Sequence, residues 1–499
     1  MATRKTRGGR RKGSRSTPPD DAGRGAAGPG EGRGWAGRVV VVPGPDGFAY
    51  VPGELLTTDA TRTLEVAGRL FPRLELRLVE EEDETLRAAP ARRLRGAFDA
   101  PDAPGVPRLV RELRAAGAPV QPNHVFFAHC TEGCCCGPHP AMRGCGPGAS
   151  PVYASPVYAS PVYASPVYAS PVYASPVYAS PVYASPVYAS PVYASPAEAS
   201  TGLRRSSARP VVDGAASAAA LAKLEVAAAT KAEGSPHVVV LDTGLPASDA
   251  PHFPGGFGGL GGLLSHSYGP NDVPDDDGDD LVDPAAGHGS FIAGLIEQVS
   301  PGAVVDSRAV IEPLGNADEW AIHVAIHDLA PSGERGAVLN LSFGGQVLTE
   351  PGVLASAIGF AQDLGYVVVA SAGNDATCRP TYPAAFPDVV SVGAIGPHGP
   401  APFTNYGPWV RACAPGVDLV STFFAYDGAE TAAAPDPDPD AFDGWATWSG
   451  SSFSAPIVAA ALVNHMRTHD VHATTAVERV VDDPALLRLA DLGTVVNVA

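Results

Sequence analysis

The chain has 499 residues, 45% of them hydrophobic, which is enough for two domains with linkers and a substantial core. Glycine (56) and proline (51) are abundant, so a good part of the chain is expected to be turn, linker or disordered segment. The net charge is −19, but residues 1–36 hold nine basic and three acidic residues and carry +6, which leaves −25 on the remainder.

Residues 1–36 are predicted to be a disordered basic tail. Such a tail can contact nucleic acid or anionic lipid, but no aromatic or apolar pattern accompanies the charge, so we favour a solvated terminus and predict no nucleic-acid partner. No apolar segment typical of a signal peptide follows the arginines, and no apolar run suits a membrane span. The cytoplasm is therefore the expected compartment, with export by another route left open.

Residues 37–128 have the pattern of a small globular domain. The runs at 38–42 and 76–82 predict strands, and apolar spacing over 106–117 predicts a helix. A further strand-like run ends near residue 128. Two or three strands with one or two helices indicate a small α+β domain.

Residues 129–149 form a Cys-rich segment that is not core composition. Its cysteines are Cys130, Cys134, Cys135, Cys136 and Cys145. Their spacing matches no paired CxxC zinc pattern, so disulfides or reduced thiols are favoured over a zinc site. Cys378 and Cys413 lie far along the chain beside apolar segments, and a bond between the two is left open.

Residues 150–200 are predicted to be a disordered linker, because they contain the unit PVYAS nine times over 151–195. A proline at every fifth position prevents a continuous helix, and a unit without charge and with one large side chain cannot build a core.

The rest of the chain alternates strand and helix patterns. Residues 201–235 include an alanine-rich stretch that predicts a connecting helix. From 236 to 499, amphipathic stretches separate continuous apolar runs, which are typical of strands buried on both faces. These runs are 237–241, 303–311, 337–343, 366–372 and 389–395. We therefore predict an α/β domain with a mostly parallel sheet covered by helices on both faces.

Three polar residues stand where strands end and helices begin, the usual place for reactive groups in such a sheet. Asp242 closes an apolar strand, His288 stands between glycines, and Ser452 opens an apolar helix. A serine hydroxyl needs a base to become a nucleophile, and imidazole needs a carboxylate to fix its tautomer. Each residue alone is a common turn or cap residue, but together they suit nucleophilic catalysis.

The motifs around these residues resemble those of the subtilisin-like serine proteases (subtilases). DTG at 242–244, GHGS at 287–290 and GSSFSAP at 450–456 match the active-site motifs of that family in its order. The resemblance covers about half of the chain and implies a subtilisin-like fold in which the three residues are the catalytic triad. It also implies that Asn374, in VVVASAGND, supplies a side chain to the oxyanion hole.

The segment LNLSFGG resembles the family's edge strand, so Ser342, Phe343 and Gly344 are expected to hold the substrate backbone as an added strand. The implied function is a serine endopeptidase that acts on peptides or proteins through an acyl-enzyme. The alternative is a peptide-maturation protease or macrocyclase of narrow specificity. A scaffold without catalysis is disfavoured by the complete triad.

The chain departs from the family pattern at a few positions. Ser290 and Ser451 stand where the family usually has threonine, and Phe291 stands where it usually has histidine. None of these changes removes a catalytic group. The acidic, proline-rich segment 425–444 is predicted to be an inserted surface loop near the nucleophile.

The segment 270–284 contains seven aspartates around one glycine. Closely spaced carboxylates on a turn are calcium ligands, and subtilases often bind calcium. Asp275, Asp277 and Asp279 are therefore candidate ligands, weighed against a solvated acidic loop, while the expected reaction requires no cofactor.

The segment GAPVQPNHVFF at 117–127 resembles the end of subtilase propeptides. The resemblance implies that residues 37–128 act as an inhibitor and folding chaperone of the enzyme. The PVYAS repeat then lies where the family has its cleavage junction, and we interpret it as a tether that keeps inhibitor and enzyme at high effective concentration. Cleavage at its tyrosines by the enzyme itself, and a repeat without function, are the alternatives.

Overall fold

The structure is a computed structural model. The residues that it describes are 39–42, 47–81, 89–98, 105–128, 206–211, 214–230, 237–246, 266–268, 272–276, 281–301, 303–427 and 441–496. The predicted basic tail (1–36), Cys-rich segment (129–149) and repeat linker (150–200) lie outside these residues.

The N-terminal part of the described chain forms an antiparallel sheet in the order β5–β2–β4–β3, with β1 also paired to β2. Helices α1 and α3 share one hydrophobic core with this sheet. The elements are β1 (Val40–Val42), β2 (Phe48–Thr57), α1 (Ala60–Leu70), β3 (Leu76–Leu78), β4 (Arg92–Gly96), α3 (Val106–Ala115) and β5 (Val120–Ala128).

Three of these elements, β2, α1 and β4, have no counterpart in the sequence-based prediction. The strand β2 contains Pro52 and Gly53, which in sequence indicate a turn. In the structure its pairing with β5 shifts register between Tyr50 and Leu55, and the strand continues through the irregularity.

The C-terminal part is built on a larger sheet in the order β19–β20–β16–β14–β13–β11–β7–β9–β8. From β20 to β8 every neighbouring pair is parallel, as predicted. The strands are β7 (His237–Asp242), β8 (His266–Tyr268), β9 (Val304–Ala309), β11 (Ala337–Leu341), β13 (Tyr366–Ser371), β14 (Val390–Gly396), β16 (Ala412–Pro415), β19 (Arg488–Leu489) and β20 (Gly493–Val495), with β15 (Gly399–Pro400) paired to β14.

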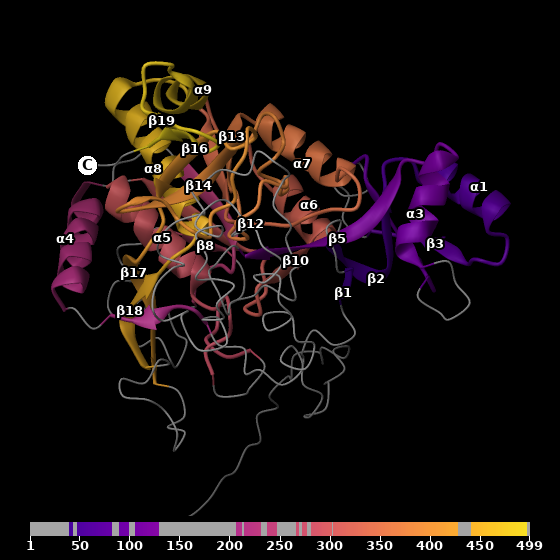
Figure 1. The fold of residues 1–499 in the computed structure, drawn as a ribbon, viewed down its shortest axis with the longest axis horizontal. Helices are drawn as coiled ribbons and strands as arrows, with labels where there is room; N and C mark the ends of the chain where they lie inside the picture. The colour runs from indigo at the N-terminus through magenta and orange to yellow at the C-terminus, as the bar shows by residue number, and fades with distance from the viewer. Residues whose placement is uncertain are drawn as a thin grey trace, which may run out of the picture. The chain divides into compact units, whose positions relative to one another are not determined.

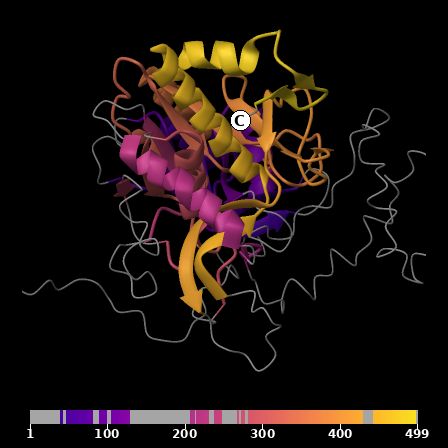
Figure 2. The same ribbon diagram turned by 90° about the vertical axis from the view of Figure 1, so that its left-hand side faces the viewer.

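Helices cover both faces of this sheet (Figure 1). Helices α5 and α8 pack against one face, α6 and α7 cover the other, and α4 packs beside α5 (Figure 2). Their bounds are α4 (Gly214–Thr230), α5 (His288–Val299), α6 (Glu319–His327), α7 (Gly352–Asp363), α8 (Ser451–His469) and α9 (Ala473–Val477), with a π-helical turn η7 (Glu478–Asp482). Among the described residues, no helix combines the length and apolar character needed to cross a bilayer.

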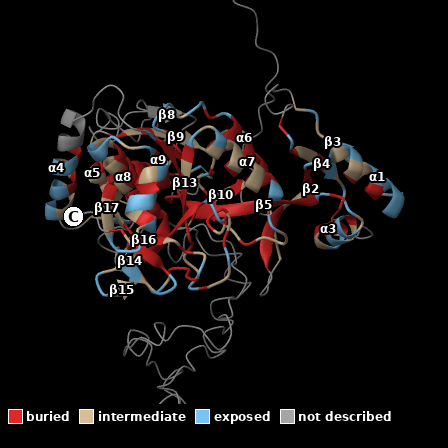
Figure 3. Ribbon diagram, turned by 90° about the horizontal axis from the view of Figure 1, so that it is seen from above, coloured by how far each residue is buried: buried red, intermediate tan, exposed pale blue. Residues whose placement is uncertain are grey.

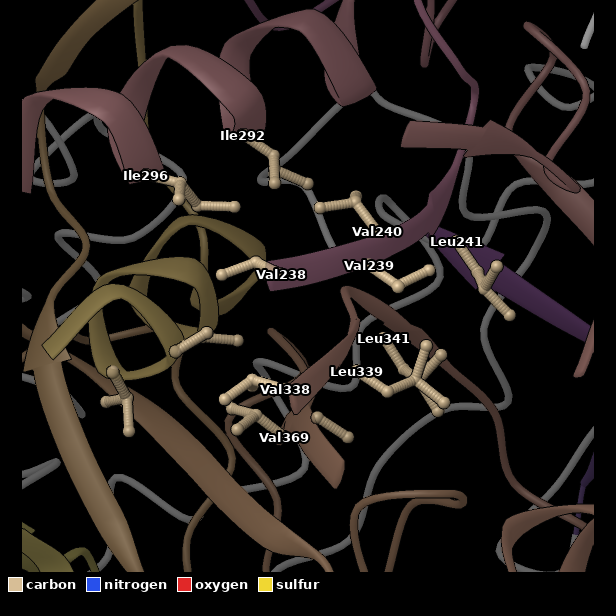
Figure 4. Close-up of a cluster of buried hydrophobic side chains, with 14 of the residues drawn as sticks. Val238, Val239, Val240, Leu241, Ile292, Ile296, Val338, Leu339, Leu341 and Val369 are labelled. Carbon is tan, nitrogen blue, oxygen red and sulfur yellow. The ribbon is translucent and has the colours of Figure 1, made fainter. Parts of the chain in front are cut away.

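The core between β7 and α5 explains why a continuous apolar run forms the central strand. Alternate residues of a strand point to opposite faces, and Val238 and Val240 lie on the side that faces Ile292 and Ile296 of α5 (Figure 4). Val239 points to the other side of the strand and is also buried, so both faces of β7 need apolar side chains.

Strand β5 of the N-terminal sheet also pairs with two short strands of the C-terminal part. It lies antiparallel to β10 (Asn316–Asp318) on one side and to β12 (Phe343–Gly344) on the other. Every residue of β5 is buried (Figure 3). The two parts of the described chain are therefore joined through this strand.

The predicted loop at 425–444 is shorter than the sequence indicated. Strand β17 (Leu419–Asp427) and strand β18 (Ala441–Trp448) form an antiparallel hairpin that occupies both ends of this segment, and β6 (Arg209–Pro210) pairs with β18. Aromatic residues at 442, 445 and 448 suit a strand better than a loop.

Replacing Leu339 by alanine should lower the free energy of unfolding by about 2–5 kcal/mol, because a fully buried leucine in a central strand leaves a cavity. Leu339 is 0% exposed on β11, between β7 and β13. Urea unfolding followed by tryptophan fluorescence measures the change. Leu487→Ala is the control: its side chain is 69% exposed, so the free energy should change by no more than about 0.5 kcal/mol. Equal effects of the two variants would contradict this description of the core.

Candidate active site

The site lies at the carboxyl ends of the parallel strands. Asp242 is the last residue of β7, and His288 is the first residue of α5. The Nδ1 atom of His288 lies 2.8 Å from Oδ1 of Asp242, and both side chains are fully buried. The same carboxylate oxygen accepts the backbone N–H of Thr243 at 2.8 Å. The structure thus brings the predicted carboxylate and base into direct contact.

Ser452 lies in the first turn of α8 and is also buried. Its hydroxyl donates to the backbone carbonyl of Ser342 at 2.8 Å. In the described part of the chain, the Nε2 atom of His288 has no hydrogen-bond partner. The hydroxyl therefore has to turn from the carbonyl of Ser342 toward His288 before the imidazole can take its proton.

Glycines let the turn before α5 approach the end of β7. Gly287 has φ of 78°, in the left-handed region that favours glycine. A Cβ atom added to Gly289 would lie 2.4 Å from the carbonyl oxygen of Gly244. Larger residues at these two positions would push the imidazole away from Asp242.

Aromatic side chains surround the imidazole of His288. The ring centroids of Phe453 and Trp448 lie 5.2 Å and 5.5 Å from that of His288. Phe291, which stands where the family usually has histidine, packs against both, with centroids at 4.6 Å and 5.7 Å. Phe291 thus enlarges the aromatic cluster that packs against His288, and the polar groups of the site stay in place.

Asn374 follows β13 and lies beside the start of α8. Its Oδ1 atom accepts the backbone N–H of Ser451 at 2.9 Å, and the Ser451 hydroxyl accepts the N–H of Gly373 at 3.0 Å. The amide nitrogen is the donor end of the same side chain. The structure thus places the side chain of Asn374 next to the residue that precedes Ser452.

Asn405 is a buried residue that the sequence-based reasoning missed. Its Oδ1 atom accepts the N–H groups of Asp375 (2.9 Å) and Thr377 (3.2 Å), and its Nδ2 donates to the carbonyl of Ala372 (2.9 Å). These hydrogen bonds hold the loop that contains Asn374 in place. In sequence, only a threonine and a tyrosine flank this asparagine, so no motif marks it.

The predicted substrate edge coincides with β12 and the residue before it. Phe343 and Gly344 pair antiparallel with Ala128 and Phe127 of β5, and the Ser342 hydroxyl donates to the carbonyl of Ser452 at 2.7 Å. The edge that was expected to bind an extended peptide is therefore paired with an extended segment of the chain itself.

The predicted calcium ligands are only partly within the described residues. Asp275 is described, whereas Asp277 and Asp279 lie outside. Within the described residues, no group of three or more His, Cys, Asp or Glu side chains could hold a metal ion. Nearby, the carboxylate of Asp283 accepts the backbone N–H of Asp276 at 2.6 Å, as in a turn. Calcium binding by this segment stays a prediction.

Another aspartate of the acidic segment 270–284 is buried beside the residues that adjoin Asp242 and His288. Asp272 is fully buried and accepts hydrogen bonds from Thr243 and Gly287, the residues next to Asp242 and His288. Burial raises the pKa of Asp272 well above its ordinary value, and the nearby charge of Asp242 adds to the increase. The sequence could not single it out among seven aspartates.

The structure decides whether Cys378 and Cys413 form a disulfide, which the sequence left open. Cys378 is disulfide-bonded, whereas Cys413 is a free, buried thiol. These two residues therefore do not bond to each other. Cys413 lies in β16, where it packs among apolar side chains.

The protein is thus an α/β protein in which an aspartate at a strand end contacts a histidine at a helix start, with a buried serine at the start of a second helix. Residues 235–479 match the profile of the subtilase family. This part of the chain belongs to that family.

Sequence alignments with individual relatives cover about half of this chain or less. A thermophilic serine proteinase from Bacillus sp. (strain AK1) is 30% identical over 266 residues, which cover 51% of this chain and 58% of that protein. Subtilisin BL from Lederbergia lenta is 28% identical over 204 residues, 37% of this chain and 65% of the relative. The crystal structure of fervidolysin from Fervidobacterium pennivorans, a keratinolytic enzyme related to subtilisin, aligns at 17% identity with a TM-score of 0.48, covering 90% of this chain and 60% of that one.

The thiol of Cys413 should resist iodoacetamide at about pH 8 while the chain is folded, because only the thiolate reacts. Burial raises its pKa to about 12, so almost all of the group stays protonated at that pH. Peptide mass spectrometry after alkylation measures the modified fraction. The same treatment in urea is the control and should modify Cys413 fully, and equal modification in both conditions would show that the thiol is accessible.

Proposed function

We propose that this chain is a serine endopeptidase that cleaves peptide bonds through an acyl-enzyme on Ser452. The observation that carries the proposal is the 2.8 Å contact between Asp242 and His288, in a buried site where Ser452 opens a helix. The family membership of residues 235–479 supports it.

In the proposed reaction, the Nε2 atom of His288 accepts the Ser452 proton while the hydroxyl oxygen bonds to the scissile carbonyl carbon. Asp242 holds the Nδ1–H and stabilises the imidazolium. The carbonyl oxygen becomes an oxyanion, and in this proposal the side-chain amide of Asn374 and the N-terminus of α8 stabilise it. Collapse breaks the C–N bond, and His288 returns the proton to the leaving amine. Water then repeats the sequence to release the acid and restore Ser452.

We further propose that the N-terminal part (37–128) is a tethered inhibitor of this site. Strand β5 pairs with Phe343 and Gly344 on one side and with β10 on the other, as a bound substrate strand would. A peptide cannot occupy the same edge while β5 is there. The complete burial of Ser452 is consistent with a covered site.

Side chains of β5 also cap two helices of the C-terminal part. Helix N-termini leave N–H groups without partners inside the helix. Asn123 accepts the N–H of Trp320 at 3.2 Å in α6, and Gln121 accepts the N–H of Val353 at 3.2 Å in α7. These bonds satisfy donors that would otherwise need water, and they fix the position of β5.

Glu319 connects these contacts at the centre of the interface. Its carboxylate accepts from Gln121 Nε2 at 2.7 Å and from the N–H of Leu354 at 2.9 Å, and it lies 2.8 Å from Nδ1 of His124. All of these side chains are buried. The Glu319 carboxylate keeps its contacts with Gln121 and His124 only while β5 is paired at this edge.

A peptide-maturation protease or macrocyclase remains the alternative, since it would use the same acyl-enzyme with an amine in place of water. That reaction needs water to be excluded from the acyl-enzyme. No observation on the described residues favours it over hydrolysis.

The full chain should react with a fluorophosphonate probe at Ser452 and hydrolyse casein, and Ser452→Ala should abolish labelling and reduce hydrolysis by about six orders of magnitude. Fluorescence of the labelled band and release of soluble peptides measure the two effects. Ser454→Ala, a change in the same helix at a hydroxyl bonded to Ala414 and Pro415, is the matched control and should keep the labelling.

Each result of this experiment has a distinct meaning. Absence of labelling after prolonged incubation, both in the wild type and in a Gln121→Ala, Asn123→Ala variant that weakens the docking of β5, would contradict the proposed nucleophile. Labelling without casein hydrolysis would favour narrow specificity or the ligation alternative.

The double variant Gln121→Ala with Asn123→Ala should raise the rate of labelling by at least about tenfold, because hydrogen bonds to charged groups contribute about 1.5–3 kcal/mol each. The bonds from Gln121 to Glu319 and from Asn123 to Asp318 hold β5 on the site. Time courses at fixed probe concentration measure the rate. Gln362→Ala is the control and should leave the rate unchanged, since Gln362 lies near the C-terminal end of α7 and donates to the carbonyl of Asp388. A double variant that folds normally and labels at the wild-type rate would contradict the inhibitor role.

A further inference from the structure

The residue after Asp242 and the residue before His288 are both hydrogen-bonded to a second carboxylate, that of Asp272. Oδ2 of Asp272 accepts the Thr243 hydroxyl at 3.0 Å. The N–H of Gly287 points at both carboxylate oxygens, at 3.0 Å and 3.1 Å. Ser290 lies at 3.5 Å from the same carboxylate. One buried side chain thus contacts the turn at the end of β7 and the turn at the start of α5.

Thr243 closes this arrangement into a ring. Its hydroxyl oxygen accepts the N–H of Gly289 at 2.9 Å while it donates to Asp272. The N–H groups on the two sides of His288 are therefore linked, one through Thr243 and the other directly, to the same carboxylate. Any movement of His288 away from Asp242 has to break part of this ring.

A carboxylate at this place is a costly choice for stability alone. Asp272 is 0% exposed, and burial together with repulsion from Asp242 disfavours its charged form. What a carboxylate offers is acceptor capacity toward several donors at once.

We propose that Asp272 is a positioning residue of the triad, which holds Thr243 and Gly287 so that the imidazole of His288 stays in line with Asp242. This inference rests on the proposed function, since it assumes that His288 is the base. Asp272 has no part in binding the substrate. Its loss should therefore slow the chemical step and leave the affinity for substrate unchanged, because a displacement of about 1 Å can cost on the order of 100-fold in rate.

The test uses the full chain with the fluorophosphonate probe at a series of concentrations. Asp272→Asn should lower the maximal labelling rate roughly 10- to 100-fold and change the half-saturating concentration less than about twofold. Casein hydrolysis per labelled site should fall in parallel. Asp272→Ala removes both acceptors and should lower the rate at least as far, and circular dichroism establishes that each variant is folded.

The matched control is Asp283→Asn. Asp283 is a buried aspartate of the same acidic segment, and its carboxylate accepts the backbone N–H of Asp276. This variant can change stability, but the labelling rate of each folded molecule should stay at the wild-type value.

Substitutions of Thr243 test the other connection of this hydrogen-bonded ring. Thr243→Ser keeps the hydroxyl and should keep most of the rate, whereas Thr243→Val keeps the shape and should lose about as much as Asp272→Asn. Because both changes break one connection, the double variant Asp272→Asn with Thr243→Val should be far less affected than the product of the single effects predicts.

The outcomes separate this inference from the proposed function. A wild-type chain and a Gln121→Ala, Asn123→Ala variant that neither label nor hydrolyse casein overturn the proposed function. An active wild type with an Asp272→Asn variant that folds and labels at the wild-type rate overturns the role of Asp272 alone. A loss seen only as fewer labelled molecules, with the same rate for each, also overturns it, since that is the signature of a purely structural residue.

Discussion

The hydrogen bond between Asp242 and His288 is the contact on which the site depends. It joins the end of a strand to the start of a helix 46 residues later, so neither local sequence nor either element alone can form it. Parallel strands β7, β11 and β13 end at one edge of the sheet and bring there the residues that follow them. The apolar faces of β7 and α5 fix how the helix lies on the strand. The hydrogen bond between Asp242 and His288 thus forms because the apolar side chains of β7 and α5 pack together.

Short strands beside this edge explain how an extended segment pairs with the C-terminal part. β12 follows β11 by one residue and lies outside the parallel sheet, where it pairs with β5, and the backbone groups of such a short strand take an added strand readily. In this chain the added strand is β5, which carries polar side chains toward the ends of α6 and α7 and the buried Phe126 into the main core. Backbone pairing gives the direction of the strand, and the capping side chains give its register.

The sequence predicted the parts of this arrangement that depend on short-range patterns. Asp242, His288 and Ser452 could be found because each lies within two residues of a glycine, at a junction between an apolar run and the next element. The parallel sheet could be found because its strands are continuously apolar. Asp272 could not be found, because nothing local distinguishes it from the six other aspartates of its segment. The contact of Gln121 with Glu319 spans 198 residues and exists only once both domains have folded.

The interface of β5 combines apolar and polar contacts. Phe126 of β5 lies in the core of the C-terminal part, and Leu56 of the neighbouring strand packs with Trp320 and Val353. Backbone pairs and hydrogen bonds to Glu319 and to the ends of two helices surround these apolar contacts. Hydrogen bonds to charged groups contribute about 1.5–3 kcal/mol each, and the burial of apolar side chains adds to them. Both kinds of contact therefore hold β5 in place, and the polar ones fix its register.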